Sequence, residues 1–131
     1  MRLVVDASAL VAIARQEPED LAMVRAIASG EAWASSVNIM EAGLVLVLRE
    51  GRFTAEQYRV WLAGLFVSEF TAVDAHDALA AYLAWGKGVH RAGLNMGDCF
   101  AYALAKQLDA PLLYKGDDFP LTDVRSALQP T

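Results

Sequence analysis

The 131-residue chain has one cysteine, four prolines and no long apolar run, and each shortage narrows the class of protein. A single cysteine, Cys99, excludes an internal disulfide and fits a reducing compartment. We expect it to pack in the core, since the neighbouring Asp98 would raise the pKa of its thiol. There is no internal repeat, low-complexity tract or linker, so residues 1–131 are expected to form one domain.

Features of membrane and secreted proteins are also missing. No apolar stretch approaches the roughly 18 to 20 residues that a membrane span needs. Met1 and Arg2 precede an apolar run, but Asp6 interrupts it, and the segment 15–18 is not a small-residue cleavage site. We therefore expect a soluble, cytoplasmic protein without membrane contacts.

Basic residues are fewer than acidic ones, 11 against 16, which gives a net charge of −5. This disfavours a general nucleic-acid coat, which needs a basic field, but it is compatible with an acidic cluster that holds cations. The phosphate-binding patterns G-x-x-x-x-G-K-[ST] and G-x-G-x-x-G and the nucleophile elbow G-x-S-x-G are absent. His76 and His90 lack partners at zinc-ligand spacing, so no zinc site is expected.

What the chain has is apolar residues, 56% of the total, in short runs that alternate with helical patterns. The expected strands are 2–6, 31–35, 69–73 and 110–114. The expected helices are 7–15, 18–29, 36–49, 54–67, 74–85 and 95–108. This alternation predicts an α/β fold with a parallel sheet and right-handed crossovers.

The stretch 93–106 holds the most informative carboxylate. Asn95 is a suitable N-cap, which puts Asp98 at N3, where free amides and the helix dipole favour an anion. Capping alone is a sufficient explanation of Asp98. However, its helical face offers no cation to pair with, because the residues beside it are Ala101, Tyr102 and Ala105.

Glu41 is the least ordinary acid. On a helical wheel of 36–49 it falls inside an apolar arc formed by Val37, Met40, Leu44, Val45 and Leu48. A buried carboxylate without a partner is costly. Glu41 is therefore expected either to pair with an arginine elsewhere or to point inward to a cation.

Further acids stand where strands end. Asp6 ends the first strand, and Asp117 and Asp118 follow the last, at the edge where open α/β sheets bind ligands. Each close pair of carboxylates costs roughly 4 kcal/mol at an effective dielectric near 20. Such a cluster needs raised pKa values or a cation, and oxygen ligands suit Mg²⁺ or Mn²⁺.

Four segments, Leu3–Ala9, Ser36–Glu41, Leu94–Ala103 and Leu112–Phe119, follow one another in an order and spacing that resembles the PIN-domain ribonucleases, specifically the VapC toxins of bacterial toxin–antitoxin pairs. Each segment alone is weak, but the ordered set is specific and spans essentially the whole chain. The resemblance implies a PIN-like, three-layer α/β/α fold with a central parallel sheet. It also implies a Mg²⁺-dependent endoribonuclease, usually a homodimer, that a VapB-type antitoxin holds inactive.

The resemblance also implies catalytic and metal-binding roles for four acids: Asp6, Glu41, Asp98 and Asp117. The first three match the family's motifs directly. The fourth is open, because Asp117 and Asp118 are adjacent. We prefer Asp117, which is nearer the strand end, and Asp123 is a weaker candidate.

Lys87, His90 and Arg91 lie in the glycine-rich loop before Asp98. This loop is either a phosphate-binding element for RNA beside the acids or a plain solvated loop.

Three other functions match part of the pattern. A phosphoreceiver domain needs an acceptor aspartate near mid-chain, but none lies between Asp20 and Asp74. A dehalogenase-like phosphatase needs D-x-D after the first strand, where this chain has Asp6-Ala7-Ser8. A catalytically silent PIN-fold binding module is disfavoured by the full set of acids. Metal-dependent cleavage of an RNA pool would separate these functions.

Overall fold

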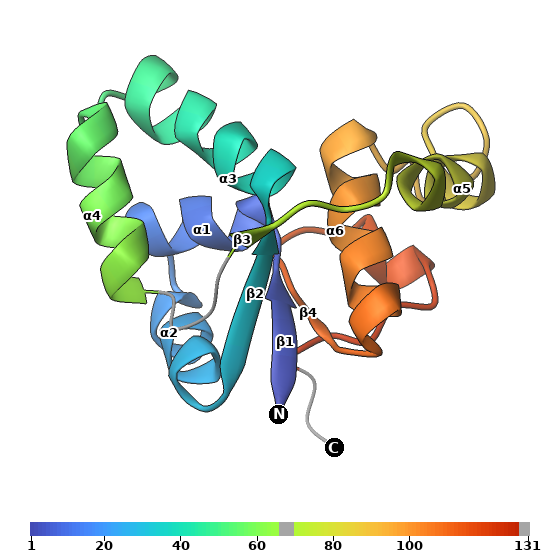
Figure 1. The fold of residues 1–131 in the computed structure, drawn as a ribbon, viewed down its shortest axis with the longest axis horizontal. Helices are drawn as coiled ribbons and strands as arrows, with labels where there is room; N and C mark the ends of the chain where they lie inside the picture. The colour runs from blue at the N-terminus through green and yellow to red at the C-terminus, as the bar shows by residue number, and fades with distance from the viewer. Residues whose placement is uncertain (66–69, 129–131) are drawn as a thin grey trace.

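A four-stranded parallel sheet in the order β3-β2-β1-β4 organises the fold (Figure 1). The computed structural model describes residues 1–65 and 70–128. The strands are β1 (Arg2–Val5), β2 (Glu31–Ser35), β3 (Phe70–Thr71) and β4 (Leu112–Leu113). The predicted parallel α/β fold is therefore confirmed.

Six α-helices, with two other helical segments, connect and follow the strands in the described ranges. The α-helices are α1 (Ala7–Ala14), α2 (Asp20–Ala28), α3 (Ser36–Gly43), α4 (Ala55–Leu65), α5 (Ala75–Trp85) and α6 (Met96–Leu108). The π-helix η1 (Leu44–Arg49) continues α3, and the 3-10 helix η2 (Phe119–Leu121) follows β4. None of the helices in these ranges is long and apolar enough to cross a membrane.

Two hydrophobic cores lie on opposite faces of the sheet. Leu3 and Val5 pack into the core formed with α1, α2 and α4, whereas Val4, between them, packs into the core formed with α5 and α6. This alternation follows from the strand period of two. Figure 1 shows α1, α2 and α4 on one side of the sheet and α5 and α6 on the other, which gives the three layers.

Most predicted boundaries agree with the structure to within two residues. The predicted strand 31–35 and helix 74–85 are confirmed, and Asp74 caps α5 through His76 N at 2.7 Å. Thr54 and Gln57 form the expected reciprocal capping bonds at α4. The predicted helix end at residue 67 and strand start at residue 69 lie outside the described residues.

The predicted apolar face of 36–49 is wrong. Met40 and Leu48, assigned to a buried arc, are 68% and 75% exposed. The buried side chains are Asn38, Ala42 and Leu46. The segment is apolar nearly all round, so the spacing of its apolar residues does not show which face is buried. The change from α- to π-helix at Leu44 also shifts the direction in which later side chains point around the helix axis.

Candidate active site

The carboxyl edge of the sheet is where acids from three segments converge. β1 ends at Asp6, β2 leads directly into α3, and α6 presents its N-terminus to the same edge. β4 ends there as well, since Asp6 N donates to the O of its last residue, Leu113, at 2.9 Å.

Asp6 is fixed by the first turn of α1. Its Oδ2 accepts from Ser8 N at 3.0 Å and from Ser8 Oγ at 2.6 Å, while its Oδ1 is buried and has no hydrogen-bond partner. The side chain is 2% exposed. Burial raises the pKa of Asp6 to about 6, and the charge of Glu41 adds to the rise despite the bonds from Ser8.

Glu41 reaches the same region from α3. Its Oε1 accepts from Asn38 Nδ2 at 3.3 Å, and the same amide donates to Gly97 O of α6 at 3.0 Å. Glycine at position 97 leaves room for this carboxylate, because a Cβ there would lie 2.3 Å from Glu41 Oε2 and the side chain would have to shift. Burial, together with the charge of Asp98, raises the pKa of Glu41.

Asp98 occupies the predicted capping box. Asp98 N donates to Asn95 Oδ1 at 2.8 Å, and Asp98 Oδ2 accepts from Asn95 N at 3.0 Å. The pKa of Asp98 is nevertheless raised to about 6, first by burial and then by the charge of Asp6. Capping therefore holds the carboxylate in place, but it does not offset the cost of its charge.

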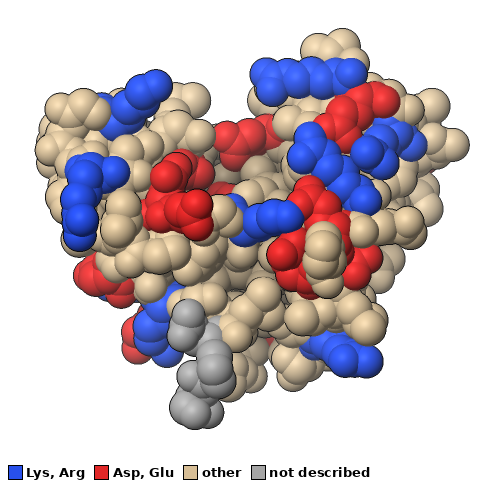
Figure 2. Space-filling model, turned by 180° about the vertical axis from the view of Figure 1, so that it is seen from behind, with Lys and Arg blue, Asp and Glu red and all other residues tan. Residues whose placement is uncertain are grey.

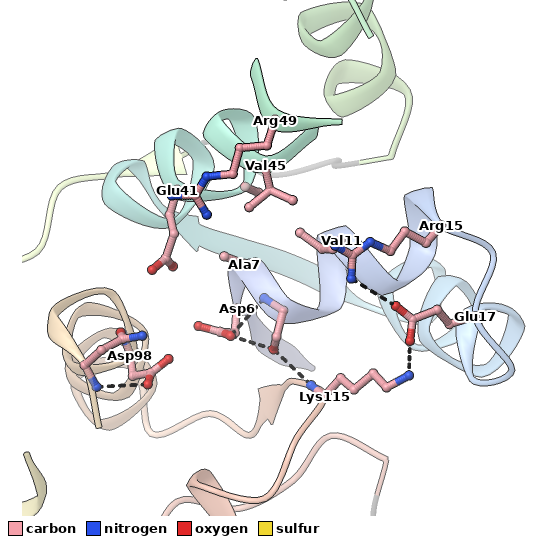
Figure 3. A pocket seen from close by; sticks show the side chains of 13 residues that line it. Asp6, Ala7, Val11, Arg15, Glu17, Glu41, Val45, Arg49, Asp98 and Lys115 are labelled. Atoms are coloured by element: carbon pink, nitrogen blue, oxygen red, sulfur yellow. Dashed lines mark hydrogen bonds and ion pairs between the residues drawn. The ribbon is translucent and has the colours of Figure 1, made fainter. Parts of the chain in front are cut away.

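These three acids border one pocket of about 460 Å³ (Figure 3). Seen from the face in Figure 2, acidic side chains gather along the hollow between the two halves of the molecule, and basic side chains surround them. Three cations line the same pocket: Arg15, Arg49 and Lys115.

The donor set of the pocket suits a hard divalent cation. It consists of carboxylate oxygens, and the unpartnered Oδ1 of Asp6 is a buried acceptor that a cation would satisfy. Across residues 1–65 and 70–128, no three acids, histidines or cysteines are close enough together to form a ready-made ligand cluster. The carboxylates are close enough, however, to raise one another's pKa values.

One of the two acids in the turn after β4 acts on the site electrostatically. Asp118 contributes to the raised pKa of Asp98, while neither Asp117 nor Asp118 lines the pocket itself. Both are exposed. The weaker candidate Asp123 is engaged elsewhere, accepting from Tyr102 Oη at 2.5 Å and from Lys106 Nζ at 2.9 Å.

The glycine-rich loop does not supply the cations that line the pocket. Lys87, His90 and Arg91 are not among the lining residues. The loop folds back on α5 instead, where the His90 ring meets Trp85 edge-on at 4.8 Å and His90 Nδ1 accepts from Ala92 N. For His90, the plain structural role is therefore the one that the contacts support.

Other residues complete the site. From the sequence, the Ser8 hydroxyl is expected either to hold a metal-bound water or to cap the helix that follows, but the N-cap of α1 is Asp6. Ser8 Oγ accepts from Lys115 N at 3.0 Å, so it links Asp6 to the turn after β4, a contact that the sequence did not predict. The close approach of Gly97 to Glu41 is long-range and has no local signal. The position of Arg49 on the pocket wall depends on the π-helix η1, which cannot be predicted from a run of apolar residues. Cys99 is buried as predicted, and burial raises the pKa of its thiol to about 11.

Comparisons with known proteins agree with this architecture. The family model described as PIN domain matches residues 3–124. The chain is 45% identical to a ribonuclease VapC of Mycolicibacterium smegmatis over 93% of this chain and 97% of that protein. It is 40% identical to ribonuclease VapC30 of Mycobacterium tuberculosis, over 98% of this chain and 100% of the other.

Among solved structures, the fold resembles that of Mycobacterium tuberculosis VapC20, described as a toxin that cleaves the sarcin–ricin loop. The TM-score is 0.70 at 17% sequence identity, covering 93% of this chain and 95% of that one. This likeness supports the fold, and the two sequence relatives support the subfamily. The chain belongs to the PIN-domain family, among the VapC proteins.

Proposed function

We propose that this protein is a Mg²⁺-dependent endoribonuclease toxin that hydrolyses RNA phosphodiester bonds. The observation that carries the proposal is the convergence of Asp6, Glu41 and Asp98, from three separate segments, on one pocket where burial raises the pKa of each. Relatives named ribonuclease VapC, alignable over nearly the whole chain, support the same activity.

Asp6, Glu41 and Asp98 would hold the ion, with Mn²⁺ as a possible substitute. When bound, Mg²⁺ lowers the pKa of a water and stabilises negative charge on a phosphodiester. The chain's own contribution is to keep the carboxylates oriented: Ser8 holds Asp6, Asn38 holds Glu41, and Asn95 holds Asp98. Such supporting bonds determine how well a ligand set works.

For the fourth acid, Asp117 remains the sequence-based prediction. The electrostatic coupling to Asp98 favours Asp118. Both lie in the turn after β4, which Ser8 ties to the site through Lys115 N.

The resemblance to the VapC toxins also suggests the partners. We propose that a VapB-type antitoxin neutralises the protein and that the chain forms a homodimer. Exposed apolar side chains are available for such contacts on α3 and α5, including Met40, Leu79 and Leu83.

The test is cleavage of total RNA and of a synthetic oligoribonucleotide by the purified chain, with Mg²⁺, with Mn²⁺ and with a chelator. We expect cleavage with either ion, none with the chelator, and inhibition by the product of a neighbouring antitoxin gene. Intact RNA in all conditions, from a folded protein that binds Mg²⁺, would instead favour the catalytically silent binding module. Mapping RNA 5′ ends after expression would identify the target.

A further inference from the structure

The three cations that line the acidic pocket differ in their partners. Arg15 Nε lies 3.0 Å from Glu50 Oε2, and Arg15 Nη1 lies 3.6 Å from Glu17. Lys115 Nζ is bound by Glu17 and, at 2.8 Å, by Glu19. These two cations are already committed, and using either to bind a substrate would require breaking existing ion pairs.

Arg49 is different. No carboxylate within residues 1–65 and 70–128 lies within 4.0 Å of its guanidinium, and its side chain is exposed. It nevertheless lines the same pocket as the acids. Figure 3 shows its side chain extending from the helix in the direction of Glu41. An uncommitted guanidinium on the wall of an acidic pocket is available to an anionic ligand.

The π-helix is what places Arg49 there. At about 100° per residue, eight residues of regular α-helix would leave Arg49 roughly 80° away from Glu41 around the axis. The π-helix turns through a smaller angle per residue, because each hydrogen bond spans one residue more. This change brings Arg49 back towards the face of Glu41 and Val45, and π-helical turns are frequent at functional sites.

We propose that Arg49 binds a backbone phosphate of the RNA next to the one that is cleaved, an inference that rests on the proposed function. Arg49 is an exposed residue of the pocket wall, whereas Asp6 is 2% exposed, so the guanidinium lies nearer the solvent than the carboxylates and can meet the RNA backbone at a phosphate beside the one held at the acids. A planar guanidinium suits a phosphate because it donates two parallel hydrogen bonds. Arg49 therefore contributes to RNA affinity rather than to bond cleavage.

Binding is tested first, in an Asp6→Asn background that leaves the RNA intact. A labelled single-stranded oligoribonucleotide is titrated at several salt concentrations with and without Arg49→Gln. We expect roughly tenfold weaker binding, as for loss of a charged hydrogen bond, and a salt-dependence slope smaller by about 0.7, as for one phosphate contact on a single strand. Arg49→Lys should keep the slope and most of the affinity.

The matched control is Arg25→Gln, which removes an exposed arginine from α2, away from the pocket. It should change neither affinity nor slope. With Asp6 intact, Arg49→Gln should raise KM about tenfold and leave kcat within about twofold.

Three results would overturn the proposal. They are RNA binding by Arg49→Gln equal to that of Arg25→Gln, a fall in kcat at constant KM, and a lower melting temperature without any RNA effect. The last would show that Arg49 only complements the helix dipole at the end of η1. If Arg49 governs binding but the parent protein cleaves no RNA, the proposed nuclease activity fails while the phosphate contact stands. A parent that binds no RNA overturns both.

Discussion

The two helices that bring Asp98 and Glu41 to the pocket are specified in different ways. At the start of α6, Asn95 and Asp98 form a reciprocal capping box from residues three apart, so local sequence determines the position of the carboxylate. In α3 and η1, Glu41 lies in a segment that is apolar nearly all round, and packing against α1 and α6 decides which face is buried. Local chemistry therefore fixes one side of the site, and tertiary contacts fix the other.

The largest expected effect comes from neutralising the locally fixed acid. Asp98→Asn should lower RNA cleavage by roughly 10³-fold, the scale for losing a group that stabilises transition-state charge. The capping geometry tolerates an amide oxygen, and the substitution removes a carboxylate whose charge burial disfavours. The free energy of unfolding without metal should therefore be equal or higher.

Initial cleavage rates and thermal melts of the same preparations measure the two quantities. Asp6→Asn should behave alike. Full activity in both variants would contradict the metal-binding assignment, whereas unfolding of Asp98→Asn would show that its charge is needed for the helix.

A second test concerns pH and the unfolding free energy of the metal-free protein. The pKa of Asp6 is about 6 in the folded state against an ordinary value of 3.8, so the folded protein binds more protons between these values. The contribution of Asp6 to stability therefore falls as pH rises from about 4 to 6, by about 3 kcal/mol in total.

Urea unfolding of the parent and of Asp6→Asn at pH 4 and pH 7 isolates this contribution from other acids. We expect the variant to gain stability relative to the parent on going from pH 4 to pH 7. A constant difference between the two proteins would mean that Asp6 is not desolvated as the structure indicates.

A smaller effect is expected where the two helices meet. Gly97→Ala places a Cβ within 2.3 Å of Glu41 Oε2, so the carboxylate has to move. Cleavage should fall roughly 10-fold, as for other losses of supporting contacts around a metal site. Stability should hold, because alanine is the better helix former.

Gly64→Ala in α4 is the matched control, since a Cβ added at Gly64 would meet nothing within 4 Å and the residue is remote from the pocket. It should raise stability and leave cleavage unchanged. Equal activity of the two alanine variants would mean that Glu41 tolerates displacement and contributes little to the site.

The smallest expected effect is the difference in cleavage between variants of the adjacent acids Asp117 and Asp118. Because Asp118 raises the pKa of Asp98, Asp118→Asn should lower the pKa of Asp98 and reduce cleavage more than Asp117→Asn does. The carboxyl carbon shift of Asp98, followed by NMR against pH, measures the first effect, and cleavage rates measure the second. The reverse order of rates would restore Asp117 as the fourth acid.

Sequence alone predicted the fold and the positions of Asp6 and Asp98 because their signals are local, whereas Glu41 was singled out on an apolar arc that is not the buried face of the helix. Strand and helix periods, the Asn95 cap and the acid at the end of β1 all act over a few residues. The buried face of 36–49 could not be predicted, since exposed Met40 and buried Leu46 are equally apolar. The contact of Ser8 with Lys115 N and the approach of Gly97 to Glu41 were also inaccessible, because they join residues far apart in the chain.

Asn38 couples the layers of the fold that carry the two hydrophobic cores. Its completely buried amide donates both to Glu41 of α3 and to Gly97 O of α6, so it bridges the two layers where these helices pack against each other. Partial opening between the layers would break this bridge and separate Glu41 from Asp98 while each core is still packed. Loss of catalytic geometry would then precede global unfolding, and mild denaturant would abolish RNA cleavage before the helices unfold.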